Sequence, residues 1–245
     1  MKLDGRNLVV TGGASGIGRA TVLTLCEAGG RVVFGDINEA GGAETAKMAG
    51  GRAEFVRLDI TDDASIAAFR DAAIAKTGQI DVVCNVAGWD IIQPFIENTP
   101  DFWNKIVAIN LMGPVKVTRA FLDPMIERNA GKIVNVSSDA GRVGSMGETM
   151  YAGAKGGIIA FTKSLAREMA RHRINVNCVC PGPTDTPLFA AQSERMQDAL
   201  KRAIPFKRLA QPSEIADAIL FFASGRSDYL TGQVLSVSGG LTMVD

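Results

Sequence analysis

The feature that most constrains the fold is a glycine-rich turn between an apolar run and an apolar-faced helix. The run Leu8–Thr11 is typical of a buried strand, and Gly12 to Gly18 follows it directly. Gly12 permits a tight turn, Gly16 lets the backbone approach a pyrophosphate, and Gly18 allows the helix to pack closely on the strand. This order predicts a βα unit in which the start of the helix binds phosphate groups.

Asp36 ends the second predicted strand, which covers residues 31–36. A carboxylate at this place accepts hydrogen bonds from the adenosine ribose hydroxyls and repels a 2′-phosphate. The turn Gly13-Ala14-Ser15 has no basic residue that could pair with such a phosphate. The sequence therefore favours NAD over NADP, although Asp36 could instead be the N-cap of the following helix.

Strands and helices alternate along the rest of the chain. Helices are predicted over residues 102–121 and 151–171, and a further helix begins at Pro212 or is capped by Ser213. We therefore expect one α/β domain over residues 1–245, a Rossmann fold with a doubly wound parallel sheet and helices on both faces. The less regular residues 186–210 are predicted to form a mobile substrate lid. Seven strands are expected, at residues 8–11, 31–36, 54–59, 80–84, 132–138, 174–180 and 232–237.

Composition excludes several classes of function. Lys+Arg and Asp+Glu both number 26, so a nucleic-acid or membrane-surface partner has no electrostatic support. No apolar run approaches the ~20 residues that cross a bilayer. The only histidine, His172, lies in a charged segment, which leaves little for a Ser-His-Asp hydrolase or a metal site. The four cysteines lack metal or redox spacing, and Cys178 and Cys180 are interpreted as core residues of a cytoplasmic protein.

Tyr151 and Lys155 are the strongest candidates for chemistry. They are four residues apart and share one face of a predicted helix. An ammonium near a phenol favours the phenolate, so we expect Lys155 to lower the pKa of Tyr151. Ser138, at the end of a predicted buried strand, could hydrogen-bond the same reacting oxygen. Alone, such a pair is also common on solvated helix faces.

Three further positions allow two interpretations each. Asp59 accepts a hydrogen bond from the adenine amino group, or caps the next helix. Asn110 lies in an apolar stretch and makes either a structural hydrogen bond or a water relay toward Lys155. Trp89 follows the small residues of Asn85–Gly88, which leave room for adenine and ribose, and either covers a pocket or lies in an interface.

Together these motifs resemble the short-chain dehydrogenase/reductase family over essentially the full length. Val86 and Ser238 depart from the usual residues of that family. The resemblance implies that Tyr151 is the acid/base, Lys155 binds the nicotinamide ribose, Ser138 orients the reacting oxygen and Asn110 holds a relay water. It also implies a homotetramer. The expected coenzyme-binding residues are Gly12, Ser15, Gly16, Ile17, Gly18, Asp36, Ile37, Asp59, Ile60, Asn85, Ala87, Gly88, Tyr151, Lys155, Pro181, Gly182, Thr184 and Thr186.

The substrate is predicted to carry a ring. The segments Ser138–Glu148 and Gly88–Asp90 are similar to dehydrogenases of alicyclic hydroxyacyl-CoA thioesters, the 2-hydroxycyclohexanecarboxyl-CoA dehydrogenase type, and are compatible with aromatic secondary alcohol dehydrogenases. No basic cluster for a CoA phosphate separates the two. The candidate pocket residues are Trp89, Asp90, Arg142, Val143, Met146, Met150, Phe189 and Met196.

Two other functions are considered. A 3-oxoacyl-thioester reductase usually uses NADPH, and Asp36 argues against that coenzyme. A non-catalytic nucleotide-binding regulator would have lost part of the set Ser138, Tyr151 and Lys155, and this chain retains all three.

Overall fold

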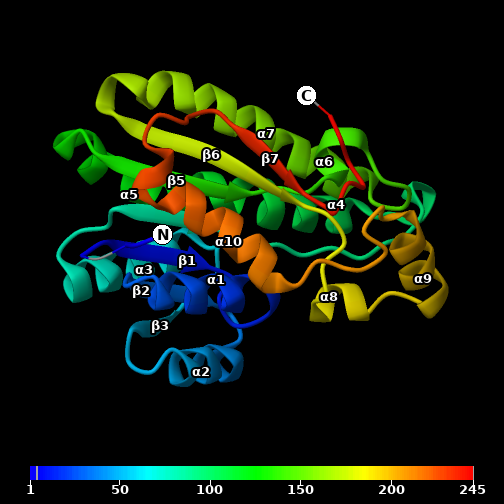
Figure 1. The fold of residues 1–245 in the computed structure, drawn as a ribbon, viewed down its shortest axis with the longest axis horizontal. Helices are drawn as coiled ribbons and strands as arrows, with labels where there is room; N and C mark the ends of the chain where they lie inside the picture. The colour runs from blue at the N-terminus through cyan, green and yellow to red at the C-terminus, as the bar shows by residue number, and fades with distance from the viewer. Residues whose placement is uncertain (4, 245) are drawn as a thin grey trace.

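In the computed structural model, which describes residues 1–3 and 5–244, parallel strands form one seven-stranded sheet in the order β3-β2-β1-β4-β5-β6-β7 (Figure 1). The chain leaves β1 toward β2 and β3, then returns to the other side of β1 for β4 to β7. The switch point therefore lies between β1 and β4, where sheets of this kind bind ligands at the carboxyl ends of the strands. The strands are β1 (Asn7–Thr11), β2 (Arg31–Asp36), β3 (Ala53–Arg57), β4 (Val82–Asn85), β5 (Gly131–Val136), β6 (Ile174–Pro181) and β7 (Val234–Val237).

Helices cover both faces of the sheet (Figure 1). On one face α1 (Gly16–Glu27) packs beside α10 (Pro212–Ala223), and on the other lie α3 (Asp63–Thr77), α5 (Gly113–Arg128) and α7 (Thr149–Met169). Val9 and Val10 point to opposite faces and join different apolar clusters, as alternation along a strand requires. Each fully buried aliphatic side chain of these clusters contributes roughly 1.5–3 kcal/mol.

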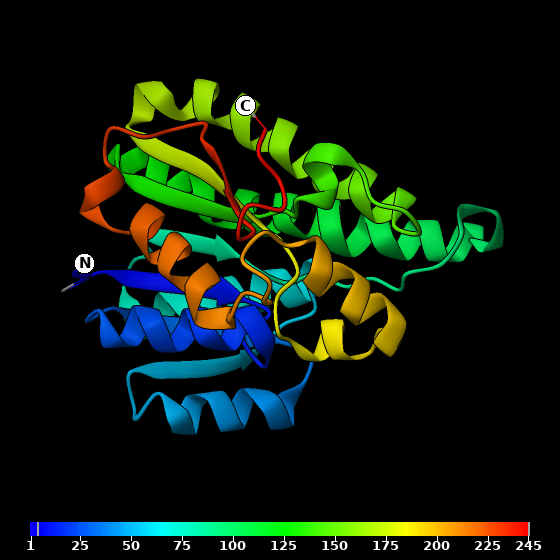
Figure 2. The same ribbon diagram turned by 45° about the vertical axis from the view of Figure 1, so that its right-hand side comes forward.

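The remaining helical elements connect these layers and gather near the carboxyl ends of the strands. Figure 2 shows α8 and α9 beyond the strand ends, over the region where the glycine-rich turn lies. Helix α2 (Glu39–Met48) lies beside β3 at one end of the sheet. The others are η1 (Phe95–Glu97), α4 (Pro100–Val107), the π-helical segment η2 (Ala108–Met112), α6 (Ala140–Val143), η3 (Ala170–His172), α8 (Pro187–Ala190), α9 (Glu194–Ala203) and η4 (Gly225–Ser227).

The predicted fold class is confirmed, and the seven predicted strands all form with small changes at their ends. The predicted continuous helix over residues 102–121 is wrong in detail, because the π-helical segment interrupts it at Asn110. Ser213 does not cap α10. Gln211 is the N-cap, in a capping box with Glu214, and Pro212 occupies the first turn.

The predicted lid, residues 186–210, contains α8 and α9. Its mobility and the extent of the single domain stay predictions. Among the described residues, no helix combines the length and the apolar character that crossing a membrane requires.

The close packing of α1 on β1 gives a first testable prediction. A β-carbon on Gly18 would overlap the Gly12 carbonyl oxygen, which is backbone and cannot move away easily. We expect Gly18→Ala to lower the free energy of unfolding by about 1–3 kcal/mol in urea titrations.

Gly153→Ala is the matched control, because its β-carbon would meet no heavy atom within 4 Å. Glycine weakens a helix, so this variant should gain about 0.5–1 kcal/mol. Equal stability of Gly18→Ala and the wild type would contradict the close packing.

Candidate active site

The glycine-rich turn and two distant segments meet at the switch point of the sheet. A β-carbon on Gly12 would lie 2.7 Å from Ala87 Cα, and one on Gly16, where φ is +50°, would lie 3.2 Å from Thr186 Cγ2. Ser15 is the N-cap of α1, but its side chain makes no capping hydrogen bond. The free N–H groups at the start of α1 therefore suit an anion such as a pyrophosphate.

Asp36 lies beside this turn at the end of β2. Its Oδ2 accepts a hydrogen bond from the Ala14 amide at 3.0 Å, and its Oδ1 accepts one from the Asn38 amide at 2.9 Å. Asn38, not Asp36, is the N-cap of α2, so the alternative role of Asp36 as a cap is wrong. The next residue, Ile37, is 64% exposed at the same edge. The carboxylate is thus fixed against the turn that is predicted to bind the coenzyme.

Asp59 is held in a turn after β3. Its Oδ1 accepts hydrogen bonds from the Thr61 amide at 2.9 Å and the Thr61 hydroxyl at 2.6 Å, and these bonds lower the pKa of Asp59. Asp62 is the cap of α3, so the capping alternative for Asp59 is also wrong. The Ile60 side chain packs against α5 at Gly113, so only its backbone can face a coenzyme.

The end of β6 and the segment after it complete this edge. Pro181 and Thr184 are buried, and the Thr184 hydroxyl donates to the Gly182 carbonyl at 2.9 Å. A β-carbon on Gly182 would lie 2.7 Å from Ser238 Cβ, so Ser238 packs closely against this turn. The predicted coenzyme residues from both halves of the chain therefore lie along one edge.

Ser138, Tyr151 and Lys155 are brought together between β5 and α7. The Ser138 hydroxyl lies near the Tyr151 phenol and acts to lower its pKa. Lys155 is 2% exposed, and its Nζ donates to the Val136 carbonyl at 3.0 Å. The Ser137 hydroxyl donates to the Lys155 carbonyl at 2.7 Å and so ties α7 to the end of β5. Two hydroxyls and an ammonium thus converge at the carboxyl edge of the sheet.

The electrostatics of Tyr151 differ from the prediction. Burial raises the pKa of Tyr151 well above its ordinary value, and the charges of Glu148 and Asp90 raise it further, against a smaller lowering effect of Ser138. The net shift is therefore upward, and the lowering effect expected of Lys155 stays a prediction. Lys155 Nζ points to the Val136 carbonyl and lies 5.6 Å from the centre of the phenol ring. Burial lowers the pKa of Lys155 itself to about 8.

Asn110 is fully buried in the π-helical segment. Its Nδ2 donates to the Trp89 carbonyl at 2.7 Å and to the Ile106 carbonyl at 3.1 Å, and its Oδ1 accepts from the Trp89 amide at 3.1 Å. A β-carbon on Gly88 would lie 3.1 Å from Asn110 Oδ1 and 3.3 Å from Lys155 Nζ, so both polar atoms flank one point. The structural hydrogen bonds are present, and the water relay stays a prediction.

Asn85 has its side chain inside the protein. Its Nδ2 donates to Thr118 Oγ1 at 2.9 Å and to Asn135 Oδ1 at 2.8 Å, and Asn135 Nδ2 donates to Thr162 Oγ1 at 2.9 Å. This chain links β4 and β5 to α5 and α7. Only the backbone of Asn85 can therefore face a coenzyme at the sheet edge.

The predicted substrate residues differ in their contacts and in their burial. Trp89 packs on Phe102, with ring centres 5.9 Å apart, and Lys105 Nζ lies 3.8 Å above its ring. The Arg142 guanidinium donates to the Val244 carbonyl at 2.6 Å. Asp90 is buried, Val143 and Met146 are exposed, and Met150, Phe189 and Met196 are partly buried.

Sequence reasoning missed two carboxyl groups. Glu148 immediately precedes α7, and its charge helps to raise the pKa of Asp90. Its position three residues before Tyr151 was the available signal. Asp139 is 4% exposed and hydrogen-bonds the Ser236 hydroxyl, and no pattern in the sequence indicated that β7 would approach it.

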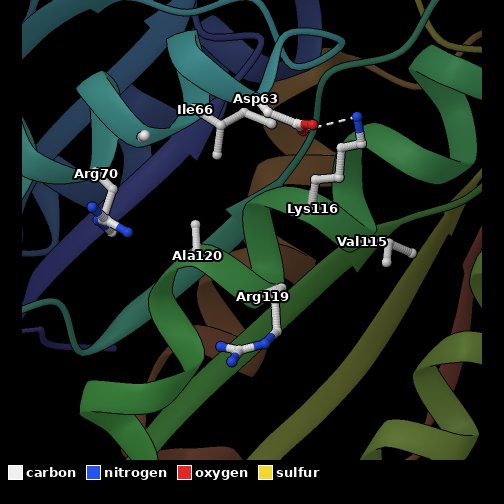
Figure 3. Close-up of a pocket in the computed structure, with 8 residues that line it drawn as sticks. Asp63, Ile66, Arg70, Val115, Lys116, Arg119 and Ala120 are labelled. Atoms are coloured by element: carbon white, nitrogen blue, oxygen red, sulfur yellow. Dashed lines mark ion pairs between the residues drawn. The ribbon is translucent and has the colours of Figure 1, made fainter.

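A surface groove of about 370 Å³ lies elsewhere, between α3 and α5 (Figure 3). Lys116 and Asp63 form an ion pair across it, with Nζ and Oδ1 2.8 Å apart. None of its lining residues belongs to the sets predicted for catalysis, coenzyme or substrate. This groove is therefore separate from the site that the sequence predicts.

The fold and this site define a nicotinamide-dependent oxidoreductase. The family model described as "Enoyl-(Acyl carrier protein) reductase" matches residues 12–242. The chain belongs to the short-chain dehydrogenase/reductase family.

Individual relatives are named for different activities. The 3-oxoacyl-[acyl-carrier-protein] reductase FabG of Thermotoga maritima is 37% identical over 99% of this chain and 100% of its own. The cis-4-hydroxycyclohexanecarboxylate dehydrogenase of Sinomonas cyclohexanicum is 40% identical over 98% of this chain and 97% of its own. Among solved structures, gox2181 has a TM-score of 0.93 at 32% identity, covering 98% of this chain and 96% of its own.

An actinorhodin polyketide ketoreductase variant with NADPH also has a TM-score of 0.93 at 32% identity. The alignment covers 98% of this chain and 99% of that one. The family is thus established, whereas its members are named for different substrates.

The hydrogen bonds of Asn110 give a second prediction. Asn110→Ala would leave the Trp89 amide and carbonyl without their partner, so we expect a loss of about 1–3 kcal/mol in the free energy of unfolding. Urea titration measures it. Asn104→Ala, an exposed change in the preceding helix, is the control and should be nearly neutral. An equally small loss of stability in both variants would contradict the conclusion that Asn110 anchors the Trp89 backbone.

Proposed function

We propose that this protein is an NAD-dependent oxidoreductase that interconverts a ring-bearing secondary alcohol and its ketone. The observation that carries the proposal is that the Ser138 hydroxyl and the Tyr151 phenol lie together beside the buried Lys155, whose Nζ is 5.6 Å from the centre of the phenol ring. Two hydroxyls that meet at one point can hold and protonate a single carbonyl oxygen.

The roles of the residues follow from their contacts. In the reducing direction, Tyr151 gives its proton to the carbonyl oxygen while Ser138 donates a hydrogen bond to the same atom. The raised pKa of Tyr151 suits this direction, because the residue is then a phenol that carries the proton. In the oxidising direction the tyrosinate takes the proton of the alcohol. NAD, when bound, supplies the acceptor or donor of the hydride at the carbinol carbon.

Lys155 is proposed to bind the nicotinamide ribose. Its ammonium has one hydrogen-bond acceptor, the Val136 carbonyl, among the described residues. Its other N–H groups suit the nicotinamide ribose hydroxyls. Asn110 flanks the same point near Gly88, where it could hold a water that passes protons to Lys155.

The choice of NAD rests on Asp36. Its carboxylate is anchored by the Ala14 and Asn38 amides at the end of β2, so it cannot swing away from an adenosine ribose easily. A 2′-phosphate at that position would be repelled by the negative charge.

The ring-bearing substrate is supported by apolar side chains and by a relative. Phe189 and Met196 in the predicted lid and Met150 in the first turn of α7 are partly buried, and an apolar ring gains from burial against such side chains. The relative from Sinomonas cyclohexanicum is named for a hydroxycyclohexanecarboxylate, which is an alicyclic secondary alcohol.

A second candidate is a 3-oxoacyl-thioester reductase. Relatives from Thermotoga maritima and Vibrio harveyi are named 3-oxoacyl-[acyl-carrier-protein] reductase, and a ketoreductase neighbour is named with NADPH. Asp36 argues against that coenzyme here. A non-catalytic nucleotide-binding regulator is disfavoured, because Ser138, Tyr151 and Lys155 are all retained and lie together.

The proposal includes a homotetramer in the cytoplasm, with residues 186–210 as a mobile lid. Exposed apolar side chains away from the site, such as Ile96 at 92% and Tyr229 at 104% exposure, support association between copies.

The proposal is tested by a substrate screen with NAD. Cyclic secondary alcohols, 1-arylethanols and hydroxyacyl-CoA esters are compared side by side by the absorbance of the reduced coenzyme. We expect turnover of at least one ring-bearing alcohol. Turnover of 3-oxoacyl thioesters with NADPH alone would favour the second candidate, and no turnover at all would favour the regulator.

Tyr151→Phe removes the acid/base and keeps the ring. We expect a loss of turnover of at least about 10²-fold, with NAD binding by calorimetry within a few-fold of the wild type. Retained turnover would exclude Tyr151 as the acid/base.

Asp36→Ala removes the charge that is proposed to repel a 2′-phosphate. The ratio of kcat/KM with NAD to that with NADP should fall by about tenfold or more, since one lost charge interaction of ~1.4 kcal/mol changes a ratio tenfold. An unchanged ratio would contradict the ribose contact.

A further inference from the structure

Two arginines lie beside Asp36, the residue that is proposed to select the coenzyme. Arg19 Nη2 donates to the Ala14 carbonyl at 2.7 Å, and the amide of the same alanine donates to Asp36 Oδ2 at 3.0 Å. Arg57 is the last residue of β3 and is the partner of Asp36 in the parallel pairing of β2 with β3. Arginine near the end of this strand is able to accommodate a 2′-phosphate, so both cations bear on the choice between NAD and NADP.

Helix α2 supplies a carboxylate to each of these arginines. Glu44 Oε2 lies 2.6 Å from Arg19 Nη2, and Glu39 Oε1 lies 3.5 Å from Arg57 Nε. The pair of Glu39 and Arg57 is the longer of the two, and both of its side chains are more than half exposed. The Arg19 side chain is only 24% exposed, so its ion pair with Glu44 is less screened by water. Of the two glutamates, Glu44 therefore carries the larger effect.

The Arg19 guanidinium is held in place by more than Glu44. Arg19 Nε donates to Thr45 Oγ1 at 3.0 Å, and Thr45 is fully buried. The Thr45 hydroxyl donates in turn to the Gly41 carbonyl at 3.0 Å. Together with the Ala14 carbonyl, these contacts give the guanidinium two uncharged partners. Replacement of Glu44 by an uncharged residue therefore leaves the cation where it is and removes its counter-charge.

The hydrogen bonds of α2 also lead back to Asp36. Asn38 Oδ1 accepts from the Gly41 amide at 3.0 Å, and the Asn38 amide donates to Asp36 Oδ1 at 2.9 Å. Since the Ala14 amide binds the other carboxylate oxygen, Asp36 and Arg19 belong to one closed set of hydrogen bonds across β2, α1 and α2. The fold thus fixes where the guanidinium lies relative to the carboxylate.

We infer that Glu44, assisted by Glu39, is a specificity-determining residue for the coenzyme, because it neutralises the cation that lies beside Asp36. Asp36 repels a 2′-phosphate, and Glu44 removes the attraction to Arg19 that would offset this repulsion. The inference deepens the proposed function, and it rests on the assignment of Asp36 to the adenosine ribose.

The inference is tested by binding, without any substrate. Calorimetric titration gives the dissociation constants for NAD and NADP of the wild type and of Glu44→Gln. The ratio of the constant for NADP to that for NAD should fall by about threefold or more in Glu44→Gln, since the guanidinium then attracts the extra phosphate. Adding Glu39→Gln should lower the ratio further.

Asp123→Asn is the matched control, because Asp123 is an exposed carboxylate that pairs with Arg119 within α5. It should leave the ratio unchanged. Loss of an exposed ion pair changes stability little, so these variants are expected to fold, and circular dichroism checks this.

A second background separates the effect of charge from an effect on structure. Arg19→Met keeps an apolar stem and removes the guanidinium. In this background Glu44→Gln should not change the ratio of the two dissociation constants. The inference would be overturned if Glu44→Gln alone weakened or strengthened both coenzymes equally. It would also be overturned if the fall in the ratio persisted without Arg19.

Failure of the proposed function gives a different result. A wild type that binds NADP more tightly than NAD would contradict the proposed coenzyme, and absence of turnover with ring-bearing alcohols would contradict the proposed reaction. The change of the ratio on Glu44→Gln still decides the role of the ion pair in either case.

Discussion

The proposed site is organised around a buried ammonium at the carboxyl end of the sheet. Lys155 is 2% exposed and donates to the Val136 carbonyl. A buried charge with one neutral partner costs free energy unless other acceptors join it. Gly88 leaves no side chain between Lys155 Nζ and Asn110 Oδ1, since a β-carbon on Gly88 would lie 3.3 Å and 3.1 Å from these atoms. The same burial that lowers the pKa of Lys155 makes it responsive to an acceptor that binds beside its ammonium.

Hydrogen bonds to backbone groups hold the rest of the site. Asn110 fixes both polar groups of Trp89, and Asp36 fixes the glycine-rich turn through Ala14. The π-helical segment brings the Asn110 amide inward, a distortion of the kind that is frequent at functional sites. Hydrogen bonds thereby fix the backbone of these loops, whereas α8 and α9 contain no fully buried residue.

The fold was predictable because its signals are local. Apolar runs alternate with helical patterns along the chain, and this alternation predicts successive βα units. The glycines Gly12, Gly16 and Gly18 mark the first of these units. The seven predicted strands all formed. The convergence of Ser138, Tyr151 and Lys155 also followed from their order and spacing. The pKa of Tyr151 did not, because it depends on burial and on the charges of Asp90 and Glu148, which lie in two separate loops. Likewise, Arg142 finds the Val244 carbonyl, a partner 102 residues away that no local pattern indicates.

The central claim is that the buried ammonium serves the coenzyme and not the fold. Calorimetric titration of NAD into Lys155→Met tests it most directly, because methionine keeps much of the apolar volume and removes the charge. The account predicts that NAD affinity falls by about tenfold or more, the effect of losing at least one charge-assisted hydrogen bond, while stability stays equal or rises. Unchanged NAD affinity in the folded variant would contradict the account.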